Sequence, residues 1–153
     1  ARRPRSRDSR PMSKRLTQLI RMLEGLPAEK AEAILAGLRQ RDPDLADQLA
    51  EHTLVFEDLR YADDKGMRAL LEKTDRRDLY LALRGAGPAV LARVVDNLST
   101  NAGAELKDAL ETMPPQRRRD VDRARTAMVA AGTRLRDEGK LVIERPGGGE
   151  EYV

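Results

Sequence analysis

The chain has 153 residues, which is enough for one compact domain or for a short stack of helical units. It contains no cysteine, so it lacks the residues for a disulfide framework, a thiolate zinc site or a Cys/His catalytic pair, and its one histidine, His52, shows no pattern of a Ser/His/Asp set and is expected to be a helix-end residue. The net charge is +3, but seven Lys and Arg stand against one Asp in residues 1–15, whereas acidic residues outnumber basic ones from Leu16 onward. No apolar run approaches the ~18 residues that could span a bilayer, and we expect a protein of the cytosol.

Residues 1–12 are rich in Arg, Ser and Pro and predict a disordered basic tail. Such a tail suits anionic lipid or nucleic acid, and a solvated linker is the other interpretation. A nucleic-acid-associated protein would show an affinity that collapses with added salt and with deletion of the tail. The remaining chain argues against specific recognition of nucleic acid, because Asp120 and Asp122 flank the basic residues 117–119 and the four aromatic side chains are scattered.

Three amphipathic helices are predicted for residues 13–52, which would form a first armadillo-like sub-unit. Asp42 followed by Pro43 is typical of a helix N-cap with proline at the first helical position. The stripes expected to be buried are Leu16, Leu19, Ile20 and Leu23, then Ala31, Ile34, Leu35 and Leu38, then Leu45 and Leu49.

Residues 53–62 are predicted to connect two sub-units, with Leu54, Val55 and Phe56 as an apolar clasp. A connector whose ends are packed and whose middle has few partners would act as a hinge. An ordinary packed loop fits the composition equally well.

Residues 63–145 predict five or six further helices of two to three turns each, followed by a flexible acidic tail at residues 146–153. The last stripe consists of Val121, Ala124, Met128 and Leu135. Only residues 140–144 indicate an extended segment. Helices this short are marginal alone, so their stripes must be buried against neighbouring helices. We therefore predict an all-α fold, an armadillo-like array of short amphipathic helices in two sub-units.

Boundary residues agree with this pattern. Further helix starts are indicated by Asp75, Ser99 and the pair Gly87 and Pro88. Left-handed closing residues are expected after three helices, at Gly25, Gly85 and Gly139.

The helix that begins near Ser99 has one apolar and one polar face. Ala102, Leu106, Leu110 and Met113 form the predicted buried stripe. Asn101, Glu105, Asp108 and Thr112 would then face outward, with Lys107 on the flank and Arg84 and Arg117 at the border. The result would be a ridge with charges of both signs, and a routine solvated helix surface is the other interpretation.

Four phrases occur in an order that resembles a known family: DPDLADQLAEHTLVFEDL, DDKGMRALLEKTDRRDLYLALRGA, DNLSTNAGAELKDAL and PPQRRRDVDRARTAMVAAGTRLRDEGKLVI. From about residue 14 to residue 153 the chain is similar to the C-terminal region of the flagellar motor switch protein FliG. The resemblance implies a non-enzymatic rotor component without a cofactor or metal, at the cytoplasmic face of the inner membrane in the flagellar basal body. The implied partners are a MotA-like stator loop, FliM-like switch proteins and other FliG copies in a ring.

The resemblance also assigns torque residues, which the family uses against the stator and in switching the direction of rotation. The family's basic residue in its LALKGA phrase falls on Arg84, and its arginine after a Gly-Pro pair falls on Arg117. A further family arginine falls on Asn101 and loses its charge. The first acid of an acidic pair falls on Asp108, and the second is replaced by Ala109. Losing two of these charges is expected to weaken stator engagement without abolishing it.

Two departures from the family leave a second function open. Thr53, Leu54 and Val55 stand where the family has a Met/Phe sequence, although Phe56 is kept, and the family's ring-anchoring and middle domains have no counterpart in the chain. The chain is therefore expected to be a fragment or a short paralog that begins near Met12. A short paralog would act as an adaptor or inhibitor that binds rotor or switch proteins through apolar helix faces without generating torque.

Overall fold

The computed structural model describes residues 13–146, and helices are the main regular structure in this part of the chain. The elements are α1 (Lys14–Glu24), α2 (Ala28–Arg41), α3 (Pro43–His52), the 3-10 helix η1 (Phe56–Tyr61), α4 (Asp64–Lys73), α5 (Arg76–Leu83), α6 (Pro88–Asp96), α7 (Thr100–Thr112) and α8 (Arg118–Asp137). The described residues form no strand, only one antiparallel bridge between Ala62 and Ile143. The predicted all-α class is confirmed. The basic tail at residues 1–12 and the acidic residues 147–153 lie outside the described residues.

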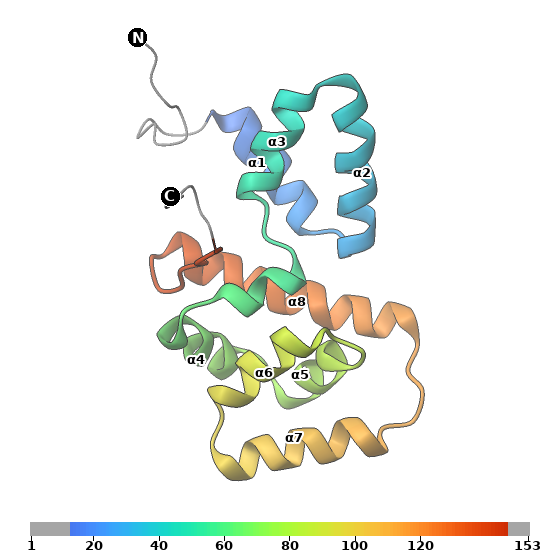
Figure 1. Ribbon diagram of the computed structural model, residues 1–153, viewed down its shortest axis with the longest axis vertical. Helices are drawn as coiled ribbons and strands as arrows, with labels where there is room; N and C mark the ends of the chain where they lie inside the picture. The colour runs from blue at the N-terminus through green and yellow to red at the C-terminus, as the bar shows by residue number, and fades with distance from the viewer. Residues whose placement is uncertain (1–12, 147–153) are drawn as a thin grey trace, which may run out of the picture.

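The helices bury two separate apolar clusters. The smaller lies among α1, α2 and α3 and consists of Ile20, Leu23, Ala31 and Leu49. The larger is shared by η1, α4, α5, α6, α7 and α8, and Leu59, Met67, Leu70, Leu106 and Met128 are among its most deeply buried residues. Helix α8 runs between the two groups, with α1–α3 on one side and α4–α6 on the other (Figure 1). Helix α7 lies at the opposite end of the molecule from α1–α3.

The last helix is much longer than expected. Helix α8 has 20 residues and therefore a length of roughly 30 Å, whereas the sequence indicated helices of two to three turns. Its buried residues Ala124, Met128 and Leu135 face α4, α5 and η1 over most of this length. A single continuous helix can form here because α4, α5 and η1 together offer a long surface for its buried side to pack against.

Most predicted helix ends are confirmed by hydrogen bonds. The side chains of Asp42, Asp75 and Ser99 each accept a hydrogen bond from a backbone N–H of their own helix, at 3.2, 2.8 and 3.1 Å. Gly85 and Gly139 have positive φ, +69° and +76°. The prediction for Gly25 is wrong, because its φ is −87° and its N–H closes α1 by hydrogen bonds to the carbonyls of Arg21 and Met22.

The prediction that Ile34 is buried is also wrong, since half of its surface is exposed. Helix α2 packs on α3 and α1 along one side, and Ala31 is its only fully buried residue. Ile34 lies at the edge of that side, so the packed stripe of α2 is narrower than its apolar stripe.

Candidate functional site

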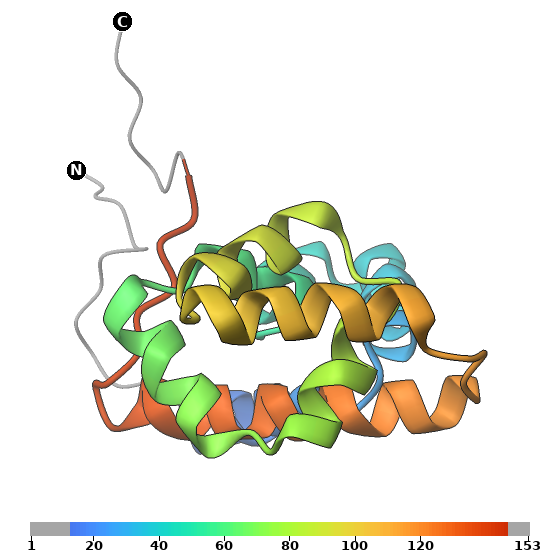
Figure 2. The ribbon, with the colours of Figure 1, turned by 90° about the horizontal axis from the view of Figure 1, so that it is seen from below.

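Helix α7 carries a solvent-facing row of polar side chains on a packed base. Leu106 and Gly103 are buried, Leu110 is half-buried against the larger core, and Met113 is half-buried. Asn101, in the first turn, and Lys107 and Asp108, in the middle, are exposed. The expected division of α7 into a packed and an outward face is therefore present in the structure. Figure 2 shows this helix along its whole length.

Arg84 reaches the carboxyl-terminal end of α7 from the turn after α5. Its side chain is half-buried, and its Nη1 donates a hydrogen bond to the carbonyl oxygen of Met113 at 3.3 Å. Met113 directly follows Thr112, the last residue of α7, as its C-cap. Arg84 is thus held in place by a contact to the backbone rather than free in solvent.

Arg117 is exposed and lies directly before the first residue of α8. It follows the same end of α7 that Arg84 contacts, whereas Asn101 lies at the other end of that helix. Among residues 13–146 the ion pairs do not involve Arg84, Lys107, Asp108 or Arg117. We call these four residues together with Asn101 the charged ridge.

The clasp residues are packed along their length. Leu54 and Phe56 are buried in the larger core, Thr53 is buried, and Val55 is half-buried. The expected middle with few partners is therefore absent from the connector as the structure describes it. A hinge role for Leu54, Val55 and Phe56 stays a prediction.

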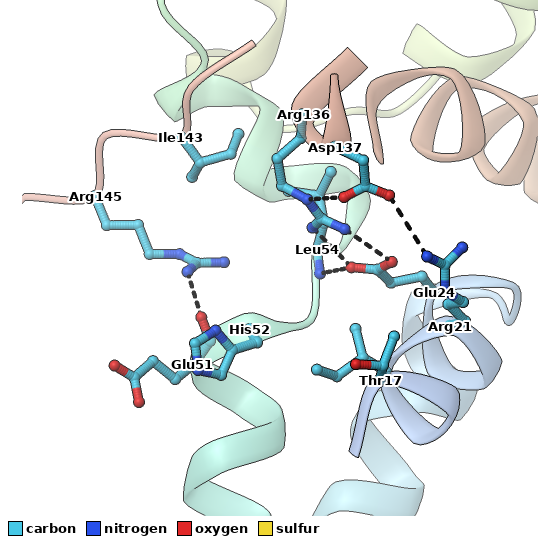
Figure 3. A pocket seen from close by; sticks show the side chains of 11 residues that line it. Thr17, Arg21, Glu24, Glu51, His52, Leu54, Arg136, Asp137, Ile143 and Arg145 are labelled. Carbon is cyan, nitrogen blue, oxygen red and sulfur yellow. Dashed lines mark hydrogen bonds and ion pairs between the residues drawn. The ribbon is translucent and has the colours of Figure 1, made fainter. Parts of the chain in front are cut away.

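A buried carboxylate ties the connector to α1 and α8. Glu24 Oε2 accepts hydrogen bonds from the Leu54 backbone N–H at 2.8 Å and from Arg136 Nη1 at 2.9 Å (Figure 3). Burial alone would lower the pKa of the Arg136 guanidinium, but the hydrogen bond and the charge of Glu24, together with Asp137, leave that pKa above its ordinary value. The first sub-unit is thereby fixed against the C-terminal helices.

Nothing in this junction resembles a catalytic or metal site. The cavity beside Glu24 has a volume of about 220 Å³, and its charged side chains largely satisfy one another (Figure 3). His52 ends α3 in an exposed position. Over residues 13–146 no three His, Cys, Asp or Glu side chains converge as a metal site would require. In the same span no helix combines the length and the apolar character needed to cross a membrane.

Sequence reasoning missed one residue that supports the ridge, Arg125 on α8. Its Nε donates to the carbonyl of Ala82 at 2.8 Å and its Nη2 to the carbonyl of Arg84 at 2.7 Å. Arg125 follows a buried residue of the α8 stripe and is one of many arginines in this helix. No spacing or motif distinguishes it, because its partners come from the end of another helix more than 40 positions away.

These features define an all-α helical array that presents a charged helix at one end. The chain belongs to the family of FliG C-terminal domains, whose model matches residues 36–143.

The similar proteins agree with this assignment. The flagellar motor switch protein FliG of Thermotoga maritima is 38% identical over 132 residues, which cover 86% of this chain and 39% of the relative. The FliG of Borreliella burgdorferi is 33% identical over 120 residues, which cover 78% of this chain and 34% of the relative. The chain therefore spans well under half the length of these relatives.

Solved structures show the same fold. A crystal structure of a FliG fragment from H. pylori superimposes with a TM-score of 0.64 at 22% identity, covering 89% of this chain and 64% of that one. The structure of full-length FliG from Aquifex aeolicus gives a TM-score of 0.56 at 25% identity, covering 88% of this chain and 42% of that one.

Proposed function

We propose that this chain is the part of a flagellar motor switch that meets the stator, and that the charged ridge is the contact surface. The support is its family together with one observation: Lys107 and Asp108 are exposed and have no ion-pair partner among the described residues, on the helix farthest from α1–α3. Charges that no other described residue neutralises are available to a second molecule.

Weak contacts suit this role. Exposed ion pairs are worth only about 0.2 to 1 kcal/mol each, and they act over a Debye length of about 8 Å at physiological salt. A rotor must release one contact before it makes the next, so several weak pairs serve better than one strong pair. The proposal involves no catalysis, cofactor or metal.

The remaining assignments follow the same family membership. We place the chain in the basal body at the cytoplasmic face of the inner membrane, as a peripheral component that takes part in switching the direction of rotation. The stator partner is a MotA-like cytoplasmic loop. FliM-like switch proteins and other FliG copies in a ring are the further partners.

Reversing single charges of the ridge tests the proposal. In the cells that make this chain, Arg84→Glu and Asp108→Lys are expected to reduce swimming strongly while flagellar filaments still assemble. The matched controls are Lys65→Glu and Glu72→Lys, which reverse exposed charges on α4. Normal swimming of both ridge variants, or equal loss in the controls, would contradict the proposal.

A further inference from the structure

The ridge residue Arg84 belongs to a turn that the connector holds at both ends. The first contact passes through Arg125, whose guanidinium carbon lies 4.9 Å from the centroid of the Phe56 ring. The same guanidinium donates to the carbonyls of Ala82 and Arg84 at the end of α5. A helix leaves these last carbonyls without donors of its own, and a cation is favourable there.

The second contact is direct. Glu57, the next residue of the connector, accepts a hydrogen bond at its Oε2 from the backbone N–H of Gly87 at 3.3 Å. Gly87 lies directly before α6, and a Cβ added to it would lie 2.8 Å from Glu57 Oε1. Two consecutive connector residues therefore hold the turn from Arg84 to Gly87. Phe56 contacts it through Arg125, and Glu57 contacts it directly.

From this turn the contacts continue to the ridge. Arg84 Nη1 donates to the carbonyl of Met113, and Met113 is the C-cap of the helix that carries Lys107 and Asp108. An unbroken series of contacts thus runs from Phe56 through Arg125 and Arg84 to the end of α7.

We propose that Arg125 and Glu57 are positioning residues that hold Arg84 in its place on the charged ridge against the packed connector. The meaning of this coupling in a motor rests on the proposed function, but the coupling itself is a property of this chain. If Phe56 left its place, Arg125 would lose the aromatic face that orients it and would no longer bridge both carbonyls. Arg84 would then lose the backbone support that presents it to Met113.

The electrostatic surroundings of Arg125 agree with this role. Burial lowers the pKa of its guanidinium, although the charges of Glu57 and Asp122 oppose that change. A cation with little water around it interacts more strongly with a ring face and with carbonyl oxygens. Arginine suits the position because its planar fork serves two acceptors while its face stacks on a ring.

Nuclear magnetic resonance on the whole 153-residue chain tests the coupling. The reporter is the carbonyl carbon of Met113, whose oxygen accepts the hydrogen bond from Arg84. We expect Phe56→Leu and Arg125→Gln to shift this signal in the same direction, and the double variant to shift it no further than the larger single change. Arg125→Lys keeps the charge but not the fork, so it should give an intermediate shift. Arg123→Gln, an exposed change on the same helix, is the control and should leave the signal in place.

The proposal is overturned if Phe56→Leu leaves the Met113 carbonyl signal where the control leaves it, or if the two single shifts simply add. Should circular dichroism show that Arg125→Gln does not fold, Arg125→Lys replaces it, and its shift should likewise not add to that of Phe56→Leu.

Swimming assays separate this inference from the proposed function. If cells that carry Arg84→Glu swim normally while Phe56→Leu shifts the Met113 signal, the stator role is wrong and the coupling stands. If cells that carry Arg84→Glu stop swimming while Phe56→Leu leaves the Met113 carbonyl signal unshifted, the coupling is wrong and the stator role stands.

Discussion

Arg84 differs from the other charges of the ridge because its position is fixed by hydrogen bonds. Its guanidinium donates to the Met113 carbonyl, and its own carbonyl accepts from Arg125. Lys107, Asp108 and Arg117 are exposed, and an exposed side chain of this kind loses rotamer entropy when a partner orders it. The pre-positioned Arg84 loses less, which makes it the most effective single charge of the proposed contact.

Asn101 provides a test at the same scale, because it stands exposed on α7 where the family resemblance places an arginine. We expect Asn101→Arg to increase swimming speed by adding a charge to the ridge. A cation in the first turn of a helix costs about 0.3 to 1 kcal/mol, so the melting temperature should fall by no more than a few degrees. Thermal unfolding and swimming of the same variant measure both effects, and slower or unchanged swimming with intact folding would contradict the assigned role of this position.

At the scale of the elements, the residues that end helices could largely be predicted from the sequence. Asp42, Asp75 and Ser99 act within three residues of their own position, so a local pattern is sufficient to identify them. The length of α8 and the exposure of Ile34 depend on which surface a neighbouring helix offers. That information lies in distant parts of the chain and does not appear in a local pattern.

Two glycines give a matched prediction of opposite sign. Gly85 has φ +69° in the turn that carries Arg84, whereas Gly37 lies inside α2. At both positions an added Cβ would meet no atom within 4 Å. Gly85→Ala should lower the free energy of unfolding by about 1 kcal/mol through backbone strain. Gly37→Ala should raise it by about 0.5 to 1 kcal/mol because alanine favours the helix.

Urea titration of both glycine variants measures these changes. Equal effects of the two substitutions would show that the left-handed conformation of Gly85 is not what the folded chain requires. A change in swimming speed with Gly85→Ala but not with Gly37→Ala would further indicate that the geometry of this turn affects the charged ridge.

At the scale of the whole molecule, the first sub-unit is joined to the C-terminal helices by Glu24. Its carboxylate is almost fully buried and accepts from Leu54 and from Arg136, which lies 112 positions further along the chain. The pattern of apolar stripes gave no indication of this junction, because a single acid at the end of a helix looks like any other surface charge. The composition of the connector fitted a hinge and an ordinary packed loop equally, and the structure shows it packed along its length.

Removing this carboxylate should weaken the contact between the two sub-units. Glu24→Ala leaves the buried Leu54 N–H without an acceptor, which we expect to cost about 2 to 3 kcal/mol of unfolding free energy and to speed hydrogen exchange at the Leu54 amide. Glu29→Ala is the control. Glu29 on α2 pairs with Arg118 on α8 and so also joins the first sub-unit to the C-terminal helices, but both of these side chains are exposed. That change should cost less than about 1 kcal/mol.

If both variants lost the same stability, or if the Leu54 amide exchanged at an unchanged rate in Glu24→Ala, the junction would not depend on the buried carboxylate. The prediction is independent of any motor function and can be checked on the isolated chain.

The rotation of single motors is the most direct test of the central claim, that the exposed charges of α7 engage a stator. Torque at stall can be measured on tethered cells that carry Asp108→Lys, beside cells that carry the α4 control Glu72→Lys. The account predicts clearly lower stall torque for Asp108→Lys with a normal number of filaments, and wild-type torque for the control. Wild-type torque in the Asp108→Lys cells would contradict it.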